Sequence, residues 1–360
     1  MGAEPPSQQP PQAKVSDTIN TYRPSRLFKA PAGANYTSID FDDSGEFLLL
    51  SRTDDTIQLF NTKAGQHAKE LKSQKYGSAL AKFTHNSTSI IYASTKVDDG
   101  IRYLSMHDNV FIRYFKGHTD RVTSLTLSPG NDNFLSASLD NTVKLWDARS
   151  PNNQGQLDFE APYLTAFDPS ATVIAIASPP AQTVHLYDYR NYDKPPFATF
   201  DLLGVEKRLQ GTHGQKEGEG WTGLEFANNG KFLLVATNGP GHYVLDAFSG
   251  ELVHYLHRAS GSTNRPAPGD QLVPEQGTTY LQADASFAPD GQFVIGGNGG
   301  QAGLLVWDIR EKARADKVLE PMCELPGSRP AAVVAHNPRH NLLASADKEV
   351  VLWMPDPDAA

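Results

Sequence analysis

The chain has 360 residues, a net charge of −9 at neutral pH and a single cysteine, Cys323. The acidic balance excludes a nucleic-acid footprint spread over the whole surface, so we expect no direct binding to DNA. One cysteine excludes an intrachain disulfide, and no apolar run approaches the length of a membrane-spanning helix. We therefore expect a cytosolic or nuclear protein that makes no contact with a membrane.

The N-terminal residues 1–16 are rich in proline and glutamine and contain almost no apolar side chains. Such a segment buries too little surface to order itself, so we expect a disordered tail. Residues 17–358 then form one folded domain. Its first predicted element is a short strand from Tyr22 to Ala30, which has no hairpin partner before it.

The clearest unit of the chain is residues 117–147. Three apolar-alternating runs fill it, namely Val122 to Leu127, Asn133 to Ser138 and Thr142 to Trp146. Tight-turn residues separate the runs, as they do in strands joined by hairpins. Gly117-His118 opens the unit and Trp146-Asp147 closes it. These features are the signature of a WD repeat, which forms one blade of a β-propeller.

Four side chains within this unit are candidates for a hydrogen-bonded relay: His118, Ser136, Asp140 and Trp146. A His, a Ser and an Asp also make up the catalytic triad of hydrolases. At this spacing, however, the four residues resemble the structural tetrad of WD repeats. A buried indole N–H and a buried imidazole both need partners, and the Ser and Asp supply them. We favour the structural interpretation.

The pair that closes the unit has counterparts along the whole chain. They are Phe60-Asn61, His107-Asp108, Trp146-Asp147, Tyr187-Asp188, Leu245-Asp246, Trp307-Asp308 and Trp353-Met354. Their spacing is close to the usual WD period of about 40 to 45 residues. We therefore predict an all-β, seven-bladed WD-repeat β-propeller. Because the chain ends soon after the strand containing Trp353, we expect the N-terminal strand around Leu27 and Phe28 to close the ring in the last blade.

Two of the intervals between these pairs are too long. We place loop insertions at about 203–220 and 259–277, which are rich in Gly, Pro and polar residues. Long loops without structure are either functional or disordered, and we favour disorder for both. Signals for chemistry are weak elsewhere. His254 and His257 are close in sequence, but no carboxylate cluster completes a metal site. We expect no metal, no cofactor and no catalytic residues, and hence a binding scaffold rather than an enzyme.

Longer strings of residues are more specific than a generic WD repeat. They are Trp146-Asp147-Ala148-Arg149-Ser150-Pro151-Asn152, Lys194-Pro195-Pro196-Phe197-Ala198-Thr199-Phe200 and Leu352-Trp353-Met354-Pro355. With these strings, the chain from about Leu27 to Pro355 resembles a fungal WD-repeat family. Members of that family are shared by the COMPASS (Set1-type) histone H3 lysine 4 methyltransferase complex and by the cleavage and polyadenylation factor.

The resemblance implies a non-catalytic nuclear adaptor. Its expected partners are an N-terminal segment of the methyltransferase catalytic subunit and, in transcription termination, subunits of the cleavage and polyadenylation factor and of a type 1 protein phosphatase module. The resemblance also implies a link to the phosphorylated C-terminal repeat of RNA polymerase II. Binding would use one face of the ring, where loops from all blades converge.

On the predicted register, five charged residues fall in or near loops of that face: Arg52, Lys96, Asp120, Arg121 and Lys348. The basic members could pair with carboxylates or phosphates of a partner. The alternative for each of them is an ordinary solvated charge.

A second function remains open. Arg149, Arg190 and Arg310 each follow a closing Trp-Asp or Tyr-Asp pair by two residues. These ends resemble the boxes by which WD-repeat substrate receptors dock to the adaptor of cullin-RING ubiquitin ligases. An arginine after the third strand of a blade is also common as plain surface.

Overall fold

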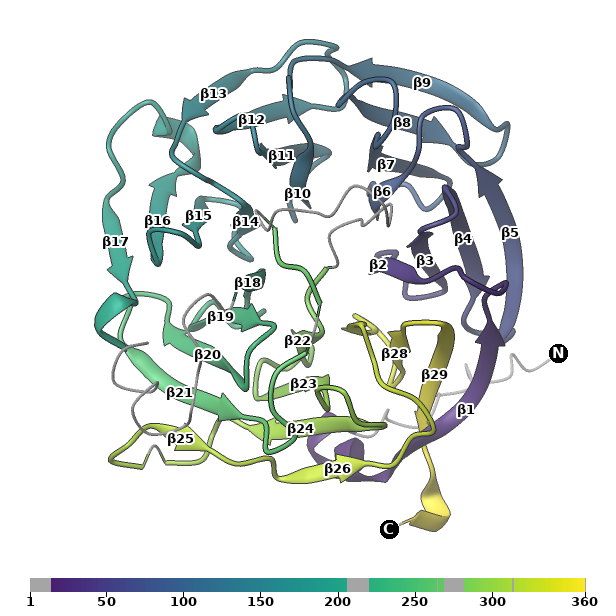
Figure 1. Cartoon of the computed structure of the whole chain (residues 1–360), viewed down its shortest axis with the longest axis vertical. Helices are drawn as coiled ribbons and strands as arrows, with labels where there is room; N and C mark the ends of the chain where they lie inside the picture. Colours follow the sequence, from purple (N-terminus) through teal and green to yellow (C-terminus); the bar gives the residue numbers. More distant parts are fainter. Residues whose placement is uncertain (1–13, 206–219, 264, 269–281, 313, 360) are drawn as a thin grey trace, which may run out of the picture.

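Seven β-sheets surround a central channel in the computed structural model of the chain (Figure 1). The structure describes residues 14–205, 220–263, 265–268, 282–312 and 314–359. Residues 1–13 of the expected tail, and most of the insertions expected at 203–220 and 259–277, lie outside these ranges. Each sheet is one blade of a propeller, which confirms the predicted fold.

The strands of blades 1 to 3 follow one another from the channel to the outer rim in chain order. Blade 1 contains β2 (Tyr36–Phe41), β3 (Phe47–Arg52), β4 (Thr56–Asn61) and β5 (Gln66–Lys72). Blade 2 contains β6 (Ala79–Phe83), β7 (Ser89–Ala93), β8 (Ile101–Ser105) and β9 (Val110–Phe115). Blade 3 contains β10 (Val122–Leu127), β11 (Asn133–Ser138), β12 (Thr142–Asp147) and β13 (Gly155–Asp158).

Blades 4 to 6 repeat this order. Blade 4 contains β14 (Leu164–Phe167), β15 (Val173–Ser178), β16 (Thr183–Asp188) and β17 (Ala198–Asp201). Blade 5 contains β18 (Trp221–Phe226), β19 (Phe232–Thr237), β20 (Gly241–Asp246) and β21 (Leu252–His257). Blade 6 contains β22 (Ala285–Phe287), β23 (Phe293–Gly297), β24 (Leu304–Asp308) and β26 (Cys323–Leu325).

Blade 7 joins the two ends of the chain. Its inner strands are β27 (Val333–His336), β28 (Leu343–Ala346) and β29 (Glu349–Pro355), and its outer strand is β1 (Tyr22–Lys29). Leu27 pairs with Val351 and Phe28 with Val350, which confirms the predicted closure of the ring. A register shift between Pro24 and Arg26 accommodates the proline, which has no N–H to donate.

A short helix precedes the closing strand. Helix α1 (Val15–Thr18) and the turn η1 (Ile19–Thr21) lead into β1, so the last two residues of the segment expected as a tail are helical. Ile19 and Tyr22 are buried in a cluster that includes Trp353, and Val15 packs against it. This apolar contact fastens the chain before the sheet begins.

The closing pair predicted for blade 2 is wrong. Leu104 pairs with Ile90 in the same way that Trp146 pairs with Phe134 in blade 3. His107 and Asp108 lie after β8, in the turn that leads to β9. Most of the other blades have an aromatic residue at this position, whereas blade 2 has a leucine. The prediction therefore selected the nearby His107-Asp108 pair, which resembles Trp-Asp more closely. The number of blades is unaffected.

Blade 5 has a fifth strand that the sequence did not predict. Strand β25 (Val318–Leu319) comes from the segment between β24 and β26 and pairs in parallel with β21 on the rim (Figure 1). Both of its side chains are buried. Two residues are too few to show strand periodicity, which explains why the pattern missed it.

The core is divided among the blades. One cluster, for example, unites Phe115 of blade 2 with Phe134 and Trp146 of blade 3. The rings of Phe115 and Trp146 meet edge to face, with centroids 5.6 Å apart. Each blade therefore buries its apolar face against its neighbour. Among the described residues, no helix is long and apolar enough to cross a membrane.

Candidate functional site: a blade 3 hydrogen-bond chain, the loop face and the channel

The four candidate tetrad residues of blade 3 form a continuous hydrogen-bonded chain. The indole Nε1 of Trp146 donates to Ser136 Oγ at 2.8 Å. Ser136 Oγ lies 2.6 Å from His118 Nε2, and His118 Nδ1 lies 2.9 Å from Asp140 Oδ2. Because an ionised carboxylate can only accept, Nδ1 carries the proton and Nε2 accepts from the serine hydroxyl. The chain links β11 and β12 to the loop before β10.

The four hydrogen-bonded side chains are buried and shielded from solvent. Burial lowers the pKa of His118, although the hydrogen bond and the charge of Asp140 oppose this. Burial raises the pKa of Asp140, but the hydrogen bonds from the Thr142 hydroxyl, the Thr119 backbone N–H and His118 outweigh burial and lower the pKa. Ser136 has no exposed surface and both sides of its hydroxyl are engaged. A substrate would have no route to this oxygen.

Other blades have only parts of this hydrogen-bonded series. In blade 7, Trp353 Nε1 donates to Ser345 Oγ at 2.9 Å. In blade 6, Gly296 occupies the register position of Ser136, and Trp307 Nε1 donates instead to the carbonyl of His257 at 3.3 Å. Within the described ranges, the full set of four bonded side chains occurs in blade 3 alone.

Four of the five candidate partner-binding residues, Lys96, Asp120, Arg121 and Lys348, lie in loops of one face, between second and third strands or before an inner strand, whereas Arg52 is the last residue of strand β3. Asp120 and Lys348 are exposed, Arg121 is half-buried, and exposed Lys96 pairs with Asp55. Arg52 differs from them, because its residue is only 5% exposed. Its guanidinium donates to Asp54 at 2.8 and 2.7 Å and to Glu70 at 3.3 Å, so its charge is already balanced within blade 1.

Lys348 borders a recess between blades 7 and 1. The recess has a volume of about 390 Å³ and is lined by residues 29–35 and by Arg329, Lys348 and Glu349. Arg329 Nε lies 3.7 Å from Glu349 Oε2. With Lys29, the wall carries three cations and one carboxylate, so an anion would be favoured there. The sequence patterns did not point to Lys29 or Arg329, because the recess forms only when the two ends of the chain meet.

The central channel contains a cavity of about 480 Å³ lined by the inner strands. Asp40 of β2 accepts from Lys82 Nζ at 2.9 Å and from the N–H of Phe83 at 2.8 Å, both on the inner strand of blade 2. Glu225 of β18 accepts in the same way from the N–H of Phe287 in blade 6. Burial raises the pKa of Glu225 to about 7. These carboxyl groups bind neighbouring inner strands to each other.

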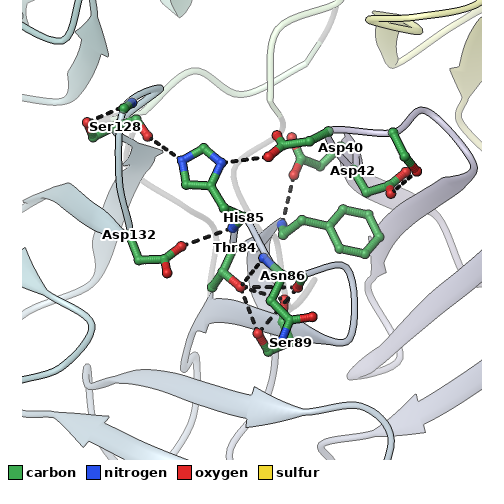
Figure 2. Close-up of polar contacts among 12 residues, drawn as sticks. Asp40, Asp42, Thr84, His85, Asn86, Ser89, Ser128 and Asp132 are labelled. Atoms are coloured by element: carbon green, nitrogen blue, oxygen red, sulfur yellow. Dashed lines mark hydrogen bonds and ion pairs between the residues drawn. The ribbon is translucent and has the colours of Figure 1, made fainter.

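His85 lies at one end of the channel, where turns of three blades meet (Figure 2). Its Nδ1 is 2.6 Å from Asp43 Oδ2 of blade 1, and its Nε2 is 3.0 Å from the carbonyl of Ser128 in blade 3. Its backbone N–H donates to Asp132 at 3.0 Å. Burial disfavours the imidazolium, but these bonds and the two carboxylate charges outweigh it and raise the pKa of His85.

Comparisons with known proteins agree with this architecture. A family model of the WD domain, G-beta repeat, matches residues 109–147, which include β9 and most of blade 3. The chain is 36% identical to WD repeat-containing protein 82 of Drosophila melanogaster over 341 residues, covering 95% of this chain and 96% of that protein. It is 34% identical to Set1 complex component swd2 of Schizosaccharomyces pombe over 348 residues, covering 88% and 92% of the two chains. The chain belongs to the Swd2 family of WD-repeat proteins.

A second fungal relative supports the same assignment. COMPASS component SWD2 of Saccharomyces cerevisiae is 33% identical over 325 residues, which cover 89% of this Swd2-family chain and 91% of that protein. The similarity therefore spans the ring rather than a single repeat. In the part of this Swd2-family protein that the structure describes, no group of three or more His, Cys, Asp or Glu side chains is arranged to hold a metal.

The three arginines considered for adaptor docking lie on blades 3, 4 and 6 of the Swd2-family ring. The side chain of Arg149 is 86% exposed and pairs with Asp147 at 2.8 Å. Arg310 pairs with Asp308 at 2.6 Å, and the backbone N–H of Arg190 donates to Asp188 at 2.9 Å. Each arginine is thus positioned by the aspartate of its own closing pair, and the structure does not bring the three together in one cluster.

Proposed function

We propose that this protein is a non-catalytic scaffold subunit of a nuclear histone H3 lysine 4 methyltransferase complex of the COMPASS type. The observation that carries the proposal is similarity along the whole ring to Set1 complex component swd2 and to COMPASS component SWD2. Similarity over all seven blades favours a shared set of partners, because partners of propellers contact loops and rims contributed by many blades.

The internal satisfaction of the polar groups in blade 3 also favours a scaffold. Ser136, His118 and Asp140 resemble hydrolase residues in type, but they are bonded in series to a buried indole. A catalytic serine has to reach its substrate, and this one is enclosed. We therefore assign the four residues to holding the blade together.

The loop face is the proposed site for the N-terminal segment of the methyltransferase catalytic subunit. Lys96, Asp120, Arg121 and Lys348 present both signs of charge around that face. An extended segment crossing several loops would contact them in turn. The basic recess beside Lys348 would suit a phosphate group, such as one of the phosphorylated C-terminal repeat of RNA polymerase II.

We also propose a second assembly, with subunits of the cleavage and polyadenylation factor and of a protein phosphatase module in transcription termination. The specific strings around Arg149, Phe197 and Trp353 support this proposal, because the family they resemble occurs in both settings. One scaffold can serve both assemblies. If both assemblies bind the same loops, they compete for the scaffold.

The alternative function is a substrate receptor of a cullin-RING ubiquitin ligase. The observation in its favour is that Arg149 and Arg310 are exposed and are held by ion pairs with Asp147 and Asp308. Charge reversal at both arginines separates the two functions. Loss of a ligase adaptor with retention of the methyltransferase would favour the receptor, whereas an unchanged set of methyltransferase subunits and no ligase adaptor favours the scaffold.

The experiment that tests the proposed function is depletion of the protein in its own cells, followed by measurement of histone H3 lysine 4 methylation and of the cellular location of a fluorescent fusion. We expect methylation to fall, wild-type protein to restore it, and the fusion to be nuclear. Unchanged methylation would overturn the proposal. A matched control is depletion restored with Arg149→Ala, which alters an exposed arginine outside the loop face.

A further inference from the structure

Exposed apolar side chains are concentrated in blade 2. Ten large hydrophobic side chains are exposed in the described part of the chain, and four of them are Val97, Val110, Ile112 and Tyr114. The last three lie on the outer strand β9 and are 58%, 47% and 43% exposed. Val110 pairs with Ser105 and Tyr114 pairs with Arg102, and a register shift at Ile112 separates them, so the three side chains do not share one face of the sheet. Exposed apolar side chains gathered on one strand still mark an interaction surface more often than isolated exposed residues do.

Strand β9 is also an open edge on the rim of the ring (Figure 1). It is six residues long, contains no proline, and has no strand paired with its outer side within the described ranges. The other outer strands differ. Strand β5 carries Lys69, Glu70 and Lys72, and β13 and β17 have only four residues each. Strand β9 carries one charged residue, Arg113, whose guanidinium donates to the carbonyl of Ala148. A largely apolar edge is a template for pairing with another chain unless something covers it.

Blade 5 shows how this fold covers such an edge. There β25 adds a fifth strand to β21, and its Val318 and Leu319 side chains are only 3% and 4% exposed. The backbone N–H of Tyr255 donates to the carbonyl of Lys317 at 2.7 Å in the same contact. The rim of a blade can therefore accept a short apolar strand in parallel, with both backbone and side-chain contacts.

The side chains beside β9 are held in place by contacts with one another. Arg102 of β8 is 3% exposed, and its guanidinium lies 3.5 Å from the ring centroid of Tyr76 and 5.1 Å from that of Tyr114. Asp98 fixes the same guanidinium through two contacts of 2.9 Å. Because these side chains are already ordered, a bound segment would lose little of its affinity to ordering them.

Charge indicates the chemistry of the segment. Lys75 lies with its Nζ 5.0 Å from the centroid of the Tyr76 ring, and Lys116 follows β9 directly. Both are exposed, and neither has a carboxylate within ion-pair distance among the described residues. Two unpaired cations beside the Tyr114 end of the strand would favour a partner with carboxylates there, although the whole chain carries a charge of −9.

We propose that β9 binds an extended segment of a partner protein, which adds to blade 2 as a fifth strand. Its apolar side chains cover Val110 and Ile112, and its carboxylates pair with Lys75 and Lys116. This inference rests on the proposed scaffold function and names one surface through which the scaffold holds another subunit. It differs from the loop face, because the contact is made on the rim and mainly by the backbone.

The test uses the purified full-length chain and a short fluorescein-labelled peptide in which valine and glutamate alternate. Fluorescence anisotropy measures the affinity for wild type, for Val110→Ser/Ile112→Ser and for Phe248→Ser. Phe248 is 94% exposed in a turn of blade 5. Phe248→Ser is therefore a control that removes exposed apolar surface at a different place on the ring. We expect binding to wild type and to Phe248→Ser, and binding at least about tenfold weaker to the double variant.

Two further probes test the register and the charge. A peptide of the same composition with its valines clustered, and one with lysine in place of glutamate, should both bind more weakly to wild type. Lys75→Gln/Lys116→Gln should remove the preference for glutamate. Equal thermal midpoints for all variants show that they are folded.

Equal binding by wild type and Val110→Ser/Ile112→Ser, or no binding by wild type, would overturn the inference. The outcome is separate from that of the proposed function. If the peptide binds as expected but methyltransferase subunits do not accompany the chain in cells, the proposed function fails and the binding surface stands.

Discussion

The imidazole of His118 lies 2.9 Å from the carboxylate of Asp140, and the two residues belong to different loops on the same face of blade 3. His118 precedes the innermost strand and Asp140 joins the second strand to the third. The bond therefore fixes the chain entering the blade against a turn formed later in the sequence. Its strength depends on burial, because the side chain of His118 is 1% and that of Asp140 is 7% exposed.

Ser136→Ala should destabilise the protein more than Ser345→Ala. The first change leaves both Trp146 Nε1 and His118 Nε2 without a partner, whereas the second leaves only Trp353 Nε1. We expect losses in the free energy of unfolding of about 2 to 4 and about 1 to 2 kcal/mol. Urea denaturation followed by tryptophan fluorescence measures both.

Trp146→Ala, which also empties the space of the indole, should cost about 3 to 5 kcal/mol in the same assay. Equal losses of unfolding free energy for the two serine variants would show that the hydrogen bond between Ser136 and His118 does not stabilise the protein. A Ser136→Ala variant that folds normally but loses a hydrolytic activity would contradict the structural role.

The stability of the protein should fall as the pH falls from about 6.5 to about 4. Burial lowers the pKa of His336 to about 4, so in this range the unfolded chain takes up a proton that the folded chain does not. This group alone accounts for up to about 3 kcal/mol, with stability complete above its ordinary pKa. Thermal unfolding at several pH values measures the slope.

His336→Gln is the control for this prediction, because it retains polar contacts with Tyr22 and Asn337 but does not titrate. Its stability should depend less steeply on pH over the same range. His85 has the opposite sign, because its pKa is raised, and its contribution is present at low pH and is lost as the pH rises through its folded pKa. An identical slope for His336→Gln and wild type would contradict the assignment.

Deleting residues 1–30 should destabilise the whole ring. The deletion removes β1, exposes the edge of β29 and uncovers the apolar cluster around Trp353. A chain lacking residues 1–13 keeps α1 and β1 and is the matched control. Differential scanning calorimetry should give a much lower midpoint for the longer deletion only. Equal midpoints for the two truncations would contradict a role for β1 in closing the ring.

Arg102→Ala should be costly and Arg149→Ala should not, although both arginines pair with an aspartate. Arg102 is buried among Tyr76 and Tyr114, so its loss empties a space between these rings and removes the cation that pairs with the partly exposed Asp98. We expect a loss of about 3 kcal/mol in the free energy of unfolding. The exposed Arg149 should give no measurable change by urea denaturation. A similar loss of unfolding free energy for both variants would show that the burial of Arg102 does not add to stability.

Local patterns were sufficient to predict the ring. Alternating apolar runs and Gly or Pro turns mark each blade, and the Trp146-Asp147 pair identifies the repeat type. The closure by Leu27 and Phe28 followed from counting strands, because an unpaired outer strand at one end and a missing one at the other leave a single solution.

Contacts between blades were not predictable in the same way. Arg102 reaches Tyr76 in the loop before its own blade, and Asp40 reaches Phe83 in the next blade. Nothing in the local pattern around either residue signals its partner, because the two are joined only by the register of neighbouring sheets. For the same reason Arg52, which ends strand β3 next to a loop, was expected to be available to partners and is buried in ion pairs.

Affinity purification of the tagged full-length chain from nuclear extract, with partners identified by mass spectrometry, tests the central claim most directly. Trp146→Ala is the control, because it weakens blade 3 and should release partners held by a folded ring. The account predicts methyltransferase subunits with the wild-type chain and fewer with the variant. Recovery of a cullin-ligase adaptor without methyltransferase subunits, or of no partner at all, would contradict it.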